Sequence, residues 1–166
     1  MKSIRFPFTA LALALLLTAA ILRAADDFKP TPAPAWQLKD VNGTVVSFDQ
    51  FKGKVVILDF WATWCAPCRS EMPGYVALQE KYAKAGLVMV GVSLDRAGPE
   101  VVKKFISDQK INYQIVLGDE KIAEAFGGVE AIPTTFIIDR QGTIRYRKVG
   151  AMPAGEFEAV VAPFLQ

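Results

Sequence analysis

The chain has 166 residues, near the usual size of one domain, and its 52% hydrophobic and 22% charged residues are typical of a globular protein. The first 24 residues hold three of its 19 basic residues and none of its 17 acidic ones, so the remainder is nearly neutral, with 16 against 17. Because a nucleic-acid partner requires clustered Lys and Arg, this balance argues against nucleic-acid binding.

The N-terminus has the layout of an export signal. An apolar run over residues 6–22 follows the cationic Lys2 and Arg5. The run is longer than a signal core of about 7 to 15 residues and shorter than a membrane span of about 20. Residues 1–24 are therefore predicted to be a signal peptide or an N-terminal membrane anchor. Either one predicts a location in the periplasm or on the extracytoplasmic face of the membrane.

A linker and one folded domain follow the signal. Residues 25–35 include the sequence KPTPAPA, which predicts a stiff Pro/Ala-rich linker. The domain is expected to cover 36–166 and to open with a β-hairpin, because Asn42-Gly43 separates two short apolar runs and favours a tight turn.

The rest of the domain alternates strands and helices. The run KVVILDFW at 54–61 predicts a central strand covered on both faces. A helix is expected over 66–84, with Pro67 in its first turn and Gly86 at its end. The elements expected after it are a strand at 87–94, a helix at 99–109, a strand at 114–117, a helix at 120–126, strands at 135–138 and 144–149, and a helix at 153–165. This order predicts an α/β fold, with a central mixed sheet covered by helices on both faces.

Two cysteines, Cys65 and Cys68, lie where the central strand meets its helix. Unsatisfied N–H groups and the dipole at a helix N-terminus favour a thiolate, and Cys-x-x-Cys motifs lower a thiol pKa from about 8.5 to about 3.5–7.5. We expect Cys65 to be the exposed nucleophile and Cys68, one turn further along, to be the buried resolving cysteine. The pattern predicts a thiol-disulfide oxidoreductase with protein thiols and disulfides as partners and no cofactor beyond the redox-active Cys65–Cys68 disulfide.

A Cys-x-x-Cys pair can also have other roles. An inert disulfide closing about four residues would add only about 2 kcal/mol of stability in the chain-entropy model. Zinc needs about four ligands, and the chain has two Cys and no His, so no metal site is expected. The absence of His also excludes Ser-His and Cys-His hydrolase sites. The alternatives that stay open are a Cu(I)-binding metallochaperone-like module and a thiol oxidase or isomerase using the same pair.

The segment DFWATWCAPC at 59–68 resembles the active-site segment of thioredoxins. The sequences FKGK at 51–54 and RSEMP at 69–73 look more like the TlpA/ResA branch, as do the N-terminal hairpin and the extra helix and strand between Gly98 and Gly118. The resemblance implies a thioredoxin fold with a central βα-type insertion and reduction of protein disulfides outside the cytoplasm. It also implies a role in keeping apocytochrome c thiols reduced and a membrane electron donor of the thiol-relay type.

The same resemblance assigns a docking surface. It implies that Ile132-Pro133 is a cis peptide facing the cysteines and that this loop pairs with the main chain of the partner. The docking residues expected are Trp64, Ala66, Pro67, Ala131, Ile132 and Pro133.

Two acids are candidates for proton handling. Asp59 lies within an apolar strand, where its pKa should rise, and the match to thioredoxins implies that it accepts the proton of Cys68. The lysine that accompanies this Asp in thioredoxins would fall at Gly91. Glu71 matches the active-site Glu of ResA-like proteins, and the alternative is a solvated acid near the helix start.

A peroxiredoxin is the rival enzyme of related fold. Its P-x-x-x-T-x-x-C pattern would require Pro at Leu58 and Thr at Ala62, and both positions fail.

Overall fold

The computed structural model describes residues 29–166, so the predicted signal or anchor and the first part of the linker lie outside the described residues. Within this described part, no helix is long and apolar enough to cross a membrane. One mixed sheet has the order β1-β8-β7-β4-β5-β6-β2-β3. Its strands are β1 (Thr31–Pro32), β2 (Gln37–Asp40), β3 (Val45–Ser47), β4 (Val55–Trp61), β5 (Leu87–Ser93), β6 (Gln114–Leu117), β7 (Thr134–Ile138) and β8 (Thr143–Val149).

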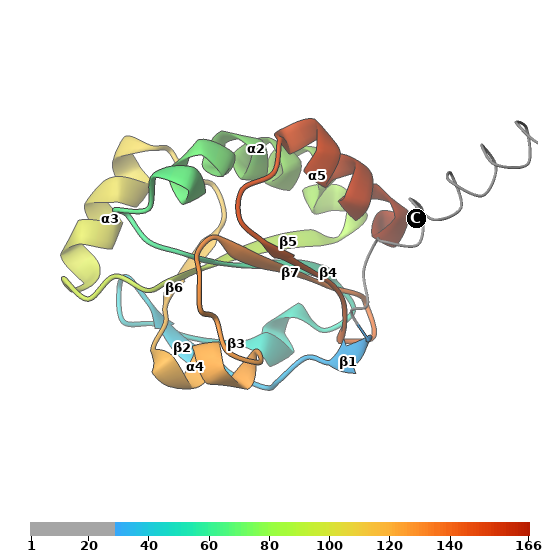
Figure 1. Ribbon diagram of the computed structural model, residues 1–166, viewed down its shortest axis with the longest axis horizontal. Helices are drawn as coiled ribbons and strands as arrows, with labels where there is room; N and C mark the ends of the chain where they lie inside the picture. The colour runs from blue at the N-terminus through green and yellow to red at the C-terminus, as the bar shows by residue number, and fades with distance from the viewer. Residues whose placement is uncertain (1–28) are drawn as a thin grey trace, which may run out of the picture.

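Helices cover both faces of the sheet, which confirms the predicted α/β fold. Helices α2, α3 and α5 lie on one face, and α4 lies on the other (Figure 1). The helices are α2 (Ala66–Tyr82), α3 (Pro99–Asp108), α4 (Glu120–Ala125) and α5 (Ala154–Val161), with 3-10 turns η1 (Phe48–Phe51), η2 (Ala83–Ala85) and η3 (Ala162–Leu165).

Strand β4 is the centre of the sheet, as its apolar run predicts. All seven of its residues are buried, and it pairs in parallel with β5 and antiparallel with β7. Alternate side chains point to opposite faces. Val56, Leu58 and Phe60 pack in the core that includes residues of α4, whereas Val55 and Ile57 pack with residues of α2 and α5. A third cluster surrounds the two cysteines.

The predicted hairpin is β2–β3, and it extends the sheet beyond β6. The Asp40 carboxylate closes its turn by accepting the N–H groups of Asn42 and Thr44, each at 2.8 Å.

Residues of the expected linker take part in the sheet, ahead of the expected start of the domain at Trp36. Within the segment expected to be a linker, Thr31 and Pro32 pair with β8, and the Ala33 N–H donates to the Gly142 carbonyl at 2.8 Å. Pro32 suits an edge strand, where a missing N–H is tolerated. β1 pairs with β8 at the edge of the sheet. The Pro-rich composition of the segment does not predict this pairing.

Candidate active site

The cysteines lie at the joint between β4 and α2, as predicted, and form a disulfide. Cys65 is the N-cap residue of α2, and its Sγ accepts the Cys68 N–H at 3.2 Å. The positive end of the helix dipole therefore acts directly on the Cys65 sulfur.

The exposed fractions of the two cysteines differ less than the sequence predicts. Cys65 is 5% exposed and Cys68 is 1% exposed. The expectation of an exposed Cys65 is wrong for the disulfide state, because its sulfur is bonded to Cys68 and lies 3.7 Å from the Ile132 carbonyl oxygen. Cys68 is the less exposed of the two cysteines, as expected.

The Ile132-Pro133 peptide is cis, as the resemblance implies. Its loop faces the cysteines through the Ile132 carbonyl and is held from both sides. The Thr134 hydroxyl donates to the Ala131 carbonyl at 2.6 Å, and the Gly150 N–H donates to the Pro133 carbonyl at 2.8 Å.

The expected docking residues lie around the disulfide. Trp64 is 69% exposed, an unusual state for a large aromatic side chain. Ala66, Pro67 and Ala131 are exposed and Ile132 is half-buried, whereas Pro133 is buried. Next to the sulfurs, the structure therefore presents an apolar surface.

Asp59 is the buried carboxyl of β4, 2% exposed, on the face of the sheet that packs against α2. It accepts the Thr135 hydroxyl at 2.8 Å, and the Tyr75 hydroxyl lies 3.2 Å from the same Thr135 oxygen. Burial raises the pKa of Asp59 to about 8, against the opposing effect of the Thr135 hydrogen bond. Smaller effects come from the charge of Glu71, which raises this pKa, and from that of Lys148, which lowers it.

The position where thioredoxins carry a lysine has no room for one. Gly91 pairs directly with Asp59, and a Cβ there would lie 2.5 Å from Ile115 Cδ1 and 2.8 Å from Trp61 Nε1. The side chains of Trp61 and Ile115 occupy the space that a side chain at position 91 would need, which explains the glycine there.

Glu71 is not the solvated helix acid of the alternative interpretation. Its side chain is 3% exposed and forms an ion pair with Lys148, whose side chain is 5% exposed. The same Glu71 oxygen accepts the Met152 N–H at 2.9 Å, and Lys148 also donates to the Gly150 carbonyl at 2.8 Å.

Lys148 is not among the site residues that the sequence predicts. The one signal for its burial is that Lys148 follows Tyr146 by two positions, the period of a strand face.

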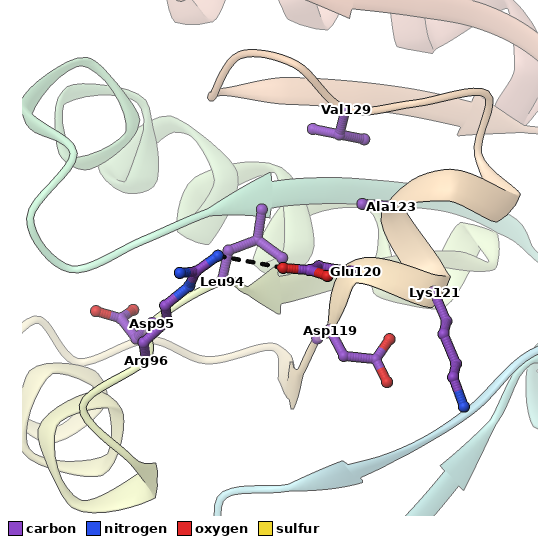
Figure 2. A pocket seen from close by; sticks show the side chains of 9 residues that line it. Leu94, Asp95, Arg96, Asp119, Glu120, Lys121, Ala123 and Val129 are labelled. Carbon is purple, nitrogen blue, oxygen red and sulfur yellow. Dashed lines mark hydrogen bonds and ion pairs between the residues drawn. The ribbon is translucent and has the colours of Figure 1, made fainter.

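Asp95, which holds the loop that leads to the cysteines, is also absent from the predicted site residues. Asp95 accepts the Thr63 N–H at 2.9 Å and the Thr63 hydroxyl at 2.6 Å, so it fixes the chain just before Trp64. Asp95 also lines a surface pocket of about 590 Å³, which the exposed Arg96–Glu120 ion pair borders (Figure 2).

In the range 29–166, no group of three or more Cys, Asp or Glu side chains is placed to hold a metal ion.

Comparisons with known proteins agree with this geometry. Residues 30–147 match the model of the AhpC/TSA family. The thioredoxin-like protein YneN of Bacillus subtilis is 39% identical over 127 residues, covering 76% of this chain and 74% of that protein. The thiol-disulfide oxidoreductase ResA of the same organism is 36% identical over 122 residues, covering 72% and 66%.

Solved structures share the fold. The crystal structure of a thiol:disulfide interchange protein of the thioredoxin family from Chlorobium tepidum TLS superposes with a TM-score of 0.76. It is 35% identical, and the match covers 85% of this chain and all of that one. The chain therefore belongs to the AhpC/TSA family and is a thiol-disulfide oxidoreductase with the thioredoxin fold.

Proposed function

We propose that this oxidoreductase works outside the cytoplasm and reduces protein disulfides, with Cys65 as the attacking sulfur. The observation that carries the proposal is the position of the Cys65 sulfur. It caps α2, lies against the carbonyl of the cis-proline loop and has the exposed Trp64 as its chain neighbour. A nucleophile in this position is activated and next to a surface for a partner.

In the first step, the reduced protein carries a Cys65 thiolate and a Cys68 thiol. The thiolate attacks one sulfur of the partner's disulfide and forms a mixed disulfide, and the second partner sulfur leaves as a thiolate. The dipole of α2 and the Cys68 N–H stabilise the thiolate before attack.

In the second step, Asp59 as a carboxylate accepts the proton of the Cys68 thiol. The resulting Cys68 thiolate attacks the Cys65 sulfur, forms the internal disulfide and releases the remaining partner sulfur as a thiolate. Two electrons pass from the cysteine pair to the partner, and the proton on Asp59 passes to a leaving thiolate. An acid of pKa about 8 suits this exchange, because a general base works best near the operating pH.

The partner polypeptide is proposed to lie across Trp64, Ala66 and Pro67 on one side and the 131–133 loop on the other. Exposed Ala131 and half-buried Ile132 leave a main-chain edge beside the sulfur. Backbone hydrogen bonds to this edge would recognise many sequences, because they do not depend on the partner's side chains.

The cellular role is proposed on the apolar segment 6–22 and on the resemblance to the TlpA/ResA branch. Apocytochrome c is then a partner whose thiols are kept reduced, and a thiol-relay protein in the membrane supplies the electrons.

The reduction potential of the Cys65–Cys68 pair tests the direction of electron flow. Equilibration of the full chain with glutathione buffers should give a value near the −270 mV of thioredoxin, whereas a value near −120 mV, that of a strong oxidant, would overturn the reductase assignment.

A trapping experiment tests the roles of the two cysteines. Cys68→Ser should accumulate mixed disulfides with partners on Cys65, because the second step is blocked. Cys65→Ser is the matched control and should trap none. Trapping that survives the loss of Cys65 would reverse the roles.

Turnover separates an enzyme from a copper carrier. The wild-type protein should catalyse the reduction of insulin disulfides with many turnovers. Tight Cu(I) binding without any turnover would instead support the metallochaperone alternative.

A further inference from the structure

Lys148 and Glu71 form an ion pair in the protein interior, with side chains 5% and 3% exposed. The second carboxylate oxygen of Glu71 is buried and has no hydrogen-bond partner within the described chain. Removing two charges from water is unfavourable, and apolar residues of similar volume often stabilise a protein as well or better. Packing alone therefore does not explain this pair.

The pair connects the segments that carry the reaction. Glu71 lies on α2, three residues beyond Cys68, while the Lys148 ammonium also donates to the Gly150 carbonyl at 2.8 Å. The Gly150 N–H donates in turn to the Pro133 carbonyl at 2.8 Å. The ion pair thus joins the helix of the cysteines to the cis-proline loop.

Lys148 is also aligned with the buried Asp59 across neighbouring strands of the sheet. The register places Asp59 opposite Thr135 and Thr135 opposite Lys148, across β4, β7 and β8. Residues directly opposite one another point to the same face of a sheet. All three side chains therefore face α2, where Cys68 and Glu71 are buried.

Two acids and one ammonium thus share this interior. Glu71 is paired with the ammonium, whereas among residues 29–166 Asp59 accepts a hydrogen bond from the neutral Thr135 hydroxyl and forms no ion pair. The two acids are therefore not equivalent, because Glu71 has a cationic partner and Asp59 has a neutral one.

We propose that Lys148 is a positioning residue of the thiol-disulfide exchange. Its ammonium pairs with the Glu71 carboxylate, so that Asp59 is the acid that exchanges the proton with Cys68. It also holds the cis-proline loop against α2. The inference deepens the proposed function and rests on it.

The test measures the second step as a function of pH. The reduced full-length chain is mixed with glutathione disulfide, and glutathione release from its mixed disulfide with Cys65 is followed between pH 5 and 9. In Lys148→Met the midpoint should move upward by about one pH unit or more, because the charge of Lys148, which lowers the pKa of Asp59, is then absent. Below the midpoint, that shift is a loss of about tenfold in rate.

Companion variants separate charge from folding. Lys148→Arg keeps the charge and should keep the wild-type midpoint, while Glu71→Gln combined with Lys148→Met removes both charges and should move the midpoint back. Lys104→Met is the matched control, since its ion pair with Asp108 lies on the surface with side chains 77% and 53% exposed. It should leave the profile unchanged.

Two results would overturn the inference, and they have different meanings. If Lys148→Met slows release equally at every pH without moving the midpoint, Lys148 is only structural and the proposed function stands. If Asp59→Asn keeps the wild-type midpoint, Asp59 is not the proton acceptor, and that part of the proposed function fails together with this inference. Circular dichroism on each variant confirms that the compared samples are folded.

Discussion

Asp59→Asn should make the protein more stable at neutral pH and remove a pH dependence of its unfolding. The folded-state pKa of Asp59 is about 8, against 3.8 for the ordinary group. Because the folded-state value is the higher one, the stability contributed by this carboxyl is complete below about pH 4 and is lost as the pH rises to about 8.

The size of the effect follows from the shift. Each pH unit in this window costs about 1.4 kcal/mol, so the oxidised wild-type protein should lose about 4 kcal/mol of unfolding free energy between pH 5 and pH 8. Asp59 is buried, so solvent screening does not reduce this figure. The asparagine oxygen can still accept the Thr135 hydroxyl, and any cost of burying the amide is the same at every pH.

Urea unfolding of the oxidised protein at pH 5, 6, 7 and 8 measures the slope. The wild type should show a falling free energy of unfolding, and the difference from Asp59→Asn should grow with pH. Asp49→Asn is the matched control, because that carboxyl is on the surface, with its side chain 71% exposed. Parallel curves for wild type and Asp59→Asn would refute the raised pKa and with it the fit of Asp59 to proton exchange.

Three further predictions concern packing, the hydroxyl network and docking. Gly74→Ala should cost about 1–3 kcal/mol in urea unfolding, because its Cβ would lie 2.8 Å from a side-chain carbon of α5, whereas Gly155→Ala meets nothing within 4 Å and should stabilise slightly. Thr135→Val removes the hydroxyl that lowers the pKa of Asp59, so the pH at which stability stops falling should move above about 8. Trp64→Ala should leave the melting temperature unchanged, since the ring is 69% exposed, but lower kcat/KM for insulin several-fold more than for glutathione disulfide. An equal loss on both substrates would argue against a docking role for this residue.

Local patterns in the chain were enough to predict most of the fold. The apolar run of β4 and the Pro67 start of α2 are nearest-neighbour signals, and the structure places both elements where those signals indicate. The Cys-x-x-Cys spacing belongs to the same class, because one helical turn brings the two sulfurs together.

The tertiary structure decided the surroundings of the cysteines. Glu71 and Lys148 are 77 residues apart, and Asp59 and Thr135 are 76 apart, so no local pattern contains either contact. The register of β4, β7 and β8 brings Asp59, Thr135 and Lys148 onto one face of the sheet. Burial beneath α2 raises the pKa of Asp59, and Glu71 of α2 pairs with Lys148. Sequence by itself determined which atoms can exchange a disulfide, whereas the long-range packing of the sheet determined which acid is paired with a lysine and which has a raised pKa, because desolvation and charge pairing act through space and not along the chain.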